Sequence, residues 1–215
     1  MRVANTQLPS AAQTAQIVDA QRTPAGMSDI RAALAKAFQN ATGRAPSGHT
    51  LDVLSAQVSL ETAGGRQMYN FNFGGIKGVS PQGQTATYMT REVVDGADVH
   101  VAQGFRAYTS LDAGARDYVA VLSSRFPAAF QRAAAGDIDG FAHALKQAHY
   151  YTAPEAEYAT GLRNAAGSSA SALTPANEMP LQPPPGEFST SADLSRVLDA
   201  VASTAARIVD PNPTE

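Results

Sequence analysis

Glu61 is the side chain in this sequence whose position best suits proton donation. It lies near the end of an apolar run over residues 49–62, and Gly64 and Gly65 follow at once. The run predicts a buried helix, and the glycines predict its end, since glycine adopts the left-handed conformation of a helix C-terminus without steric cost. A carboxyl group there feels the negative end of the helix dipole and poor solvation, which both raise its pKa. That suits a general acid, although the commoner alternative is a solvated surface glutamate.

The segment that follows this helix is rich in aromatic, asparagine and glycine residues. Residues 69–78 read YNFNFGGIKG and show neither helical nor strand periodicity. The composition therefore predicts a shaped loop, and such a loop can wall a groove.

Four stretches of the chain resemble one known family. Residues 59–65 (SLETAGG) are similar to its ALESxxGxS motif, and residues 72–77 (NFGGIK) to its NLFGIK motif, with Phe73 and Gly74 in place of Leu-Phe. Residues 105–122 resemble FRxYxSxxEAxxDYVxLL. Residues 149–154 resemble GYATDP, with Tyr150 on the motif tyrosine and Ala153 in place of the aspartate. The family is that of the bacterial cell-wall N-acetylglucosaminidases, glycoside hydrolase family 73 of the lysozyme superfamily, which includes the flagellar-rod hydrolase and cell-separation autolysins.

The resemblance implies an α+β fold, a mainly α-helical lysozyme-like domain with a small β-hairpin lobe, over residues 27–165. It also implies a peptidoglycan hydrolase that cleaves the β-1,4 bond between N-acetylglucosamine and N-acetylmuramic acid, with Glu61 as general acid. Glu92, in the hairpin where relatives carry an acidic residue, is the first candidate for the second catalytic group. Asp95, Asp98 and the acetamido group of the substrate are the alternatives.

Tyr150 is expected to orient substrate or water beside the acid, unless the loop shifts by one residue and Tyr151 takes that place. A tyrosine that only packs the edge of the core is equally common at such a position. The residues expected to contact sugar rings and amide groups are Tyr69, Asn70, Phe71, Asn72, Phe73 and Tyr151.

Two other functions compete with the glucosaminidase. A muramidase or lytic transglycosylase of the same superfamily would share the acid and cut the neighbouring linkage. A non-catalytic glycan-binding or assembly protein would keep the fold without turnover. Glu61 within its motif favours hydrolysis, whereas the loss of the aspartate at Ala153 favours binding alone.

Helices and a hairpin are predicted around the motifs. Ser28 is expected to cap a helix over residues 29–42 that ends at Gly43. Strands over residues 85–94 and 98–108 flank Asp95-Gly96, a strong signal for a hairpin turn. Three more helices are expected: one capped by Ser110, one from Pro127 to Ala135, and one over residues 137–148.

The two ends of the chain have a different composition. Residues 1–26 predict a flexible tail, and residues 166–190, rich in Pro, Ser and Ala, predict a linker. Residues 191–209 predict an amphipathic helix. Its apolar stripe either packs back on the domain or serves self-association or docking to another protein.

Composition narrows the class of protein further. The 215 residues are 44% hydrophobic, enough for one domain with a core. The formal net charge of -3 argues against nucleic-acid binding and suits a neutral polymer such as a peptidoglycan glycan strand. No cofactor, metal site, membrane span or ordinary signal peptide is predicted. A protein that acts in the periplasm or cell wall would then need a specialised secretion system, the flagellar apparatus, a phage particle or lysis.

Overall fold

Helix α2 (Gly48–Glu61) packs against three other helices, α1 (Met27–Thr42), α4 (Pro127–Ala134) and α6 (Glu155–Ser171). The computed structural model describes residues 15–94 and 97–171. Eight of the fourteen residues of α2 are buried, on several sides of the helix. The absence of a polar face in its sequence is therefore explained by its surroundings, because a helix enclosed by protein needs no such face. Glu61 ends this helix, as the sequence predicts.

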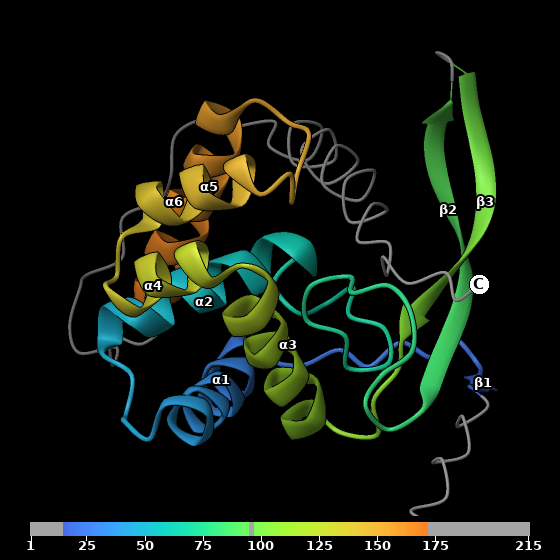
Figure 1. Ribbon diagram of the computed structural model, residues 1–215, viewed down its shortest axis with the longest axis horizontal. Coiled ribbons are helices and arrows are strands. Elements are labelled where there is room, and N and C mark those ends of the chain that lie inside the picture. The colour runs from blue at the N-terminus through green and yellow to red at the C-terminus, as the bar shows by residue number, and fades with distance from the viewer. Residues whose placement is uncertain (1–14, 95–96, 172–215) are drawn as a thin grey trace, which may run out of the picture.

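The helices gather in one body, and the β-hairpin stands at one side of it (Figure 1). The remaining elements are β1 (Gln16–Val18), β2 (Gln84–Val94), β3 (Ala97–Arg106), α3 (Leu111–Arg125) and α5 (Ile138–Gln147). This arrangement confirms the predicted α+β class with a mainly helical domain. The predicted helix over residues 191–209 and the turn at Asp95-Gly96 lie outside the described residues.

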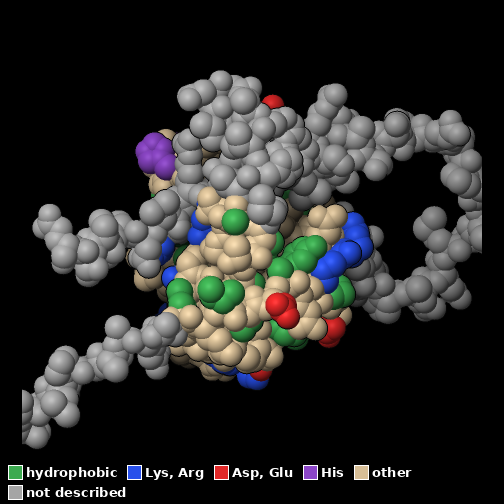
Figure 2. All heavy atoms as spheres, turned by 90° about the vertical axis from the view of Figure 1, so that its right-hand side faces the viewer, with side chains coloured by type: hydrophobic (Ala, Val, Ile, Leu, Met, Phe, Trp, Pro, Cys, Tyr) green, Lys and Arg blue, Asp and Glu red, His purple; other side chains and the backbone are tan. Residues whose placement is uncertain are grey.

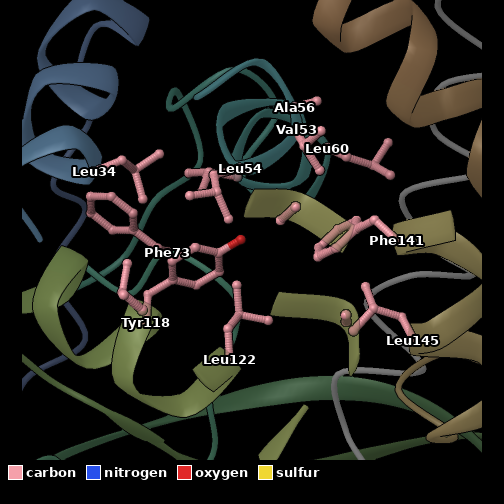
Figure 3. Packing of buried hydrophobic residues seen from close by; sticks show 14 of the residues in the cluster. Leu34, Val53, Leu54, Ala56, Leu60, Phe73, Tyr118, Leu122, Phe141 and Leu145 are labelled. Atoms are coloured by element: carbon pink, nitrogen blue, oxygen red, sulfur yellow. The ribbon is translucent and has the colours of Figure 1, made fainter. Parts of the chain in front are cut away.

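The core fills the space between α2, α3 and α5. Figure 3 shows Leu54 and Leu60 of α2 facing Leu122 of α3 and Phe141 of α5. All four side chains are at least 94% buried, from 0% exposed for Leu54 and Phe141 to 6% for Leu60. Burial of a leucine or phenylalanine side chain contributes roughly 1.5–3 kcal/mol. This packing holds the end of α2, and with it Glu61, in a fixed place.

Most predicted helix ends agree with the structure. The Ser110 side chain accepts a hydrogen bond from the Ala113 amide, and that of Asp137 accepts one from Gly140. Helix α4 begins at Pro127. The prediction for α1 is wrong by two residues: Gly26, in an extended conformation, precedes the helix and its carbonyl accepts from the amides of residues 29 and 30. Ser28 therefore lies inside the first turn and does not cap it.

Helix α6 was not predicted, and it crosses the expected boundary between domain and linker at residue 166. It runs to Ser171 and buries Tyr158, Leu162 and Ala166. Its sequence is rich in Ala, Gly and Ser, so its apolar stripe is weak. Packing on α2 compensates: a Cβ at Gly161 would lie 3.3 Å from Leu60, so the absent side chain lets the helices approach closely.

The sheet has the order β1-β2-β3. Strands β2 and β3 pair antiparallel from Thr85↔Arg106 to Val94↔Ala97, which confirms the predicted hairpin, although β3 ends at Arg106 and not at residue 108. Strand β1 pairs parallel with β2, with Ile17 opposite Thr85.

Residues 15–26 differ from the predicted tail, because their backbone bonds to the loop after α2. The Thr23 amide donates to the Met68 carbonyl at 2.9 Å, and the Ala25 amide donates to that of Gly65 at 3.1 Å. Composition could not reveal this, since a polar segment attached by its backbone lacks an apolar stripe.

We expect a truncated protein that begins at residue 27 to be less stable than one that begins at residue 15. The shorter protein loses β1 and leaves the carbonyls of Met68 and Gly65 without their partners. Each lost backbone bond costs roughly 0.5–1.5 kcal/mol. Thermal unfolding of the two proteins, both ending at residue 171, measures the difference. Equal melting temperatures would contradict the expectation.

Candidate active site

Glu61 occupies the last position of α2, with its side chain half-buried. The chain then turns sharply: Gly64 and Gly65 have φ angles of 68° and 79°. These values confirm the left-handed conformations predicted for the two glycines. At Gly65 no other residue fits, since a Cβ would lie 2.1 Å from the carbonyl oxygen of Ala25. The N-terminal segment thus packs directly behind the turn that follows Glu61.

Three buried tyrosines from three parts of the chain surround the Glu61 carboxyl. The Tyr158 hydroxyl, on α6, donates to Oε1 of Glu61 at 3.4 Å. The hydroxyl of Tyr150, in the segment between α5 and α6, also hydrogen-bonds to this carboxyl and lies 3.4 Å from the Gly74 carbonyl oxygen. Tyr118 of α3 is close enough that the charge of Glu61 raises its pKa. The predicted proximity of Tyr150 to the acid is therefore observed.

Burial raises the pKa of Glu61 to about 8, and the hydrogen bonds from Tyr158 and Tyr150 lower it by less than burial raises it. A hydrogen bond from a hydroxyl lowers the pKa of a carboxyl because it stabilises the charged form. Burial dominates, so Glu61 carries its proton at neutral pH. A carboxyl group that is protonated near pH 7 can act as a general acid.

Gln57, which the sequence analysis did not single out, connects two of these tyrosines. Its Nε2 donates to the Tyr158 hydroxyl at 3.3 Å, and its Oε1 accepts from the Tyr118 hydroxyl. A signal existed in the sequence: Gln57 is four residues before Glu61, and residues at that spacing share one face of a helix. A glutamine in an otherwise apolar run also needs buried partners.

Tyr151 does not take the place beside Glu61. Its ring stacks on that of Tyr158 with centroids 3.9 Å apart, and its hydroxyl donates to the Ala142 carbonyl. With 2% of its surface exposed, Tyr151 packs within the domain, contrary to the prediction that it contacts substrate. Next to it, Lys146 Nζ donates to the carbonyls of Thr152 and Ala153 at 3.0 and 2.7 Å. The lysine thus holds the segment in which Ala153 replaces the family's aspartate.

Three predicted substrate contacts in the loop are instead structural. The Asn72 side chain donates to the Ile76 and Arg106 carbonyls and accepts from the amide of residue 76. Asn70 bonds through its side chain to the backbone of Gln21 and Asp19. Phe73 is fully buried. An asparagine can bind the backbone as readily as a ligand, and the sequence cannot tell the two apart.

Tyr69 and Phe71 keep half-exposed side chains. The Tyr69 ring lies 5.5 Å from that of Tyr88 at the base of the hairpin, and Tyr88 stacks on Phe105 at 4.2 Å. These rings form an aromatic wall between the loop and the hairpin. Contact of Tyr69 and Phe71 with substrate stays a prediction.

Two candidates for the second catalytic group, Glu92 and Asp98, lie on the paired strands of the hairpin. Glu92 pairs with Val99 and Asp98 with Val93 toward the turn end of the hairpin, and Asp95 lies outside the described residues. The turn end rises away from the helices in Figure 1.

Within residues 15–94 and 97–171 no helix is long and apolar enough to cross a bilayer. Nor does this part of the chain bring together three or more His, Cys, Asp or Glu side chains in a group that could hold a metal ion.

An α+β, mainly helical fold whose core helix ends in a glutamic acid beside three tyrosines is the arrangement of a glycoside hydrolase of the lysozyme-like class. The family model described as mannosyl-glycoprotein endo-beta-N-acetylglucosaminidase matches residues 35–169, more than half of the chain. The chain belongs to this endo-β-N-acetylglucosaminidase family. The match confirms the family that the four sequence motifs suggested.

Solved structures agree with this assignment. A mutant of a peptidoglycan hydrolase from Sphingomonas sp. A1 is 25% identical, with a TM-score of 0.53, over 68% of this chain and 96% of that one. The catalytic domain of the autolysin Auto from Listeria monocytogenes shares the fold at 22% identity, with a TM-score of 0.51, over 70% of this chain and 88% of its own. A search of curated protein sequences finds no match to the chain.

Proposed function

We propose that this endo-β-N-acetylglucosaminidase hydrolyses the β-1,4 bond between N-acetylglucosamine and N-acetylmuramic acid in peptidoglycan, with Glu61 as the general acid. The observation that carries the proposal is the enclosure of the Glu61 carboxyl by tyrosine hydroxyls, with a pKa of about 8. The similarity to the Sphingomonas peptidoglycan hydrolase supports the choice of polymer. The site of action would then be the periplasm or the cell wall.

The charge distribution suits a glycan strand without strong net charge. Figure 2 shows the hairpin side of the molecule, where Lys and Arg side chains and Asp and Glu side chains occur singly or in small groups among uncharged atoms. A polyanion would instead favour a continuous basic surface. The aromatic wall of Tyr69 and Tyr88, with Phe71 beside it in the loop, offers faces on which sugar rings can lie.

In the proposed reaction Glu61 gives its proton to the glycosidic oxygen as the bond to the anomeric carbon breaks. Positive charge develops on the sugar ring and needs a stabilising group on its other side. Either a carboxylate such as Glu92 or the substrate's own acetamido group supplies it. Tyr150 and Tyr158 hold the Glu61 carboxyl in place and stabilise the carboxylate that remains after the proton has left.

Mass spectrometry of borohydride-reduced peptidoglycan fragments tests the proposed linkage. We expect fragments whose reducing end is N-acetylglucosamine. Reducing muramic ends would identify a muramidase, and anhydromuramic ends a lytic transglycosylase. Binding to peptidoglycan without any fragment release would identify the non-catalytic alternative and refute hydrolysis.

Glu92→Gln tests the second catalytic group. If Glu92 activates water or stabilises the charged ring, the substitution should lower turnover by roughly 10²-fold or more, the lower end of the range for acid–base groups. Asp98→Asn, two strand positions from the turn on β3, is the parallel test of the alternative carboxylate at the same end of the hairpin. A loss of less than a few-fold in Glu92→Gln would leave the role to Asp95, Asp98 or the acetamido group.

A further inference from the structure

Gln57 is a fully buried polar side chain to which the proposed reaction gives no part. It is 0% exposed on the apolar helix α2, one turn before Glu61. An amide in such a place destabilises the fold unless both of its ends are hydrogen-bonded. Both ends of Gln57 find their partners in tyrosines of the active site, and neither partner is a backbone group.

In the structure the Gln57 amide turns its oxygen to Tyr118 and its nitrogen to Tyr158. The carbonyl oxygen of Gln57 can only accept, and the Tyr118 hydroxyl supplies the hydrogen. The NH₂ group therefore faces Tyr158 and donates to its hydroxyl oxygen at 3.3 Å. In Figure 3 the Tyr118 hydroxyl points from α3 toward α2, as this bond requires.

The orientation of Gln57 determines the orientation of the next hydroxyl. Tyr158 has a single hydroxyl hydrogen. Because its oxygen already receives a hydrogen from Gln57, that single hydrogen is available for Oε1 of Glu61, 3.4 Å away. The chain of donors thus runs Tyr118, Gln57, Tyr158, Glu61, and it joins α3, α2 and α6.

We infer that Gln57 is a positioning residue for Glu61: its amide holds the Tyr158 hydroxyl so that the hydroxyl hydrogen points at the acid's carboxyl group. The inference rests on the proposed function of Glu61. The other titratable groups that act on this carboxyl in the described part of the chain are Tyr118 and Tyr150. Tyr150 reaches it independently of Gln57, so a variant of Gln57 leaves that hydrogen bond intact.

The test is Gln57→Met, which keeps the size of the side chain and removes both hydrogen bonds. The pKa of Glu61 is read by NMR titration of protein labelled with ¹³C at the glutamate side-chain carboxyls, with Glu61→Gln to assign the signal. Without the Gln57 amide the hydroxyl hydrogen of Tyr158 is no longer held toward Glu61, so we expect the pKa of Glu61 to rise by about 0.5 to 1. Turnover on peptidoglycan below pH 7 should fall roughly 3- to 10-fold. The alkaline limb of the pH–rate profile should move to higher pH.

A double-mutant cycle separates positioning from a merely structural role. If Gln57 acts through Tyr158, then Tyr158→Phe alone raises the pKa of Glu61, and adding Gln57→Met changes it little more. Ser55→Ala, which removes another buried polar group of α2 whose contacts are with Leu51, Asp52 and Arg31, is the control and should leave this pKa unchanged.

An unchanged pKa of Glu61 in a folded Gln57→Met protein would overturn the inference, as would additive effects of the two substitutions. The titration needs no substrate. An inactive wild-type protein that still shows the expected rise in pKa would therefore refute the proposed function and leave the positioning role of Gln57 standing.

Discussion

Glu61→Gln is expected to lower the turnover of peptidoglycan roughly 10²- to 10⁴-fold, the contribution of a general acid. Glutamine keeps the shape of the side chain and can still accept the Tyr158 hydrogen bond seen at 3.4 Å. It has no proton to give to the leaving oxygen. Release of reducing ends, followed over time at a fixed pH near 6, measures the loss.

The same substitution should stabilise the protein at alkaline pH. The pKa of Glu61 is raised from 4.5 to about 8 in the folded protein. Between these values the folded state binds a proton that the unfolded state has lost, so the wild-type protein loses stability as pH rises through this range. Glutamine removes this loss because it does not titrate. The melting temperature of the Glu61→Gln protein should exceed that of the wild type at pH 9 by more than at pH 5.

These two measurements check each other. Near-wild-type turnover in a folded Glu61→Gln protein would remove Glu61 from the mechanism. A difference in melting temperature that does not grow with pH would show that the Glu61 carboxyl is solvated and has the usual pKa of a glutamate. Inactivity together with alkaline stabilisation is expected only if Glu61 is both buried and the acid.

The acid and its helix could be predicted because the signal is local. An apolar run followed by two glycines fixes both the burial of α2 and its end, and the glycine φ angles of 68° and 79° agree. The hairpin was predictable for the same reason, since a turn signal lies between two runs of strand-forming residues. Motif resemblance added the position of Tyr150, which the structure places against Glu61.

The partners of the acid could not be predicted in the same way, because they depend on how distant segments pack. The rings of Tyr158 and Tyr151 stack on each other, yet only the Tyr158 hydroxyl hydrogen-bonds to Glu61. The asparagines of the loop looked like ligand-binding groups and instead hold the backbone. Asn72, for example, fixes the loop to itself and to Arg106. The residue type shows that a side chain can form a hydrogen bond, but it does not show with which partner.

Asp117 joins the hairpin to the helices, and its side chain is 7% exposed. Its carboxylate accepts from Arg106 Nη1 at 3.1 and 2.9 Å and from the Tyr108 hydroxyl at 2.5 Å. The backbone of these two residues in turn holds the loop, since the Arg106 amide donates to the Ile76 carbonyl and the Tyr108 amide to that of Asn70. One carboxylate thus helps to fix the position of the loop over residues 69–78.

Asp117→Ala should lower the free energy of unfolding by roughly 3–5 kcal/mol, because it leaves the charge of Arg106 buried without its partner. Chemical denaturation measures this change. Arg163→Ala is the control: the Arg163–Asp139 pair is 48% and 69% exposed, and an exposed pair contributes only about 0–1 kcal/mol.

A second variant shows whether the unpaired charge is the cause. Arg106→Met combined with Asp117→Leu removes both charges and refills the space, so it should be more stable than Asp117→Ala alone. If the double variant is instead the less stable of the two, the hydrogen bonds that position Tyr108 and the loop matter more than the charge. If Asp117→Ala lowers the free energy of unfolding no more than Arg163→Ala does, the backbone hydrogen bonds to residues 70 and 76 are enough to hold the hairpin. The loop over residues 69–78 then keeps its position without the ion pair.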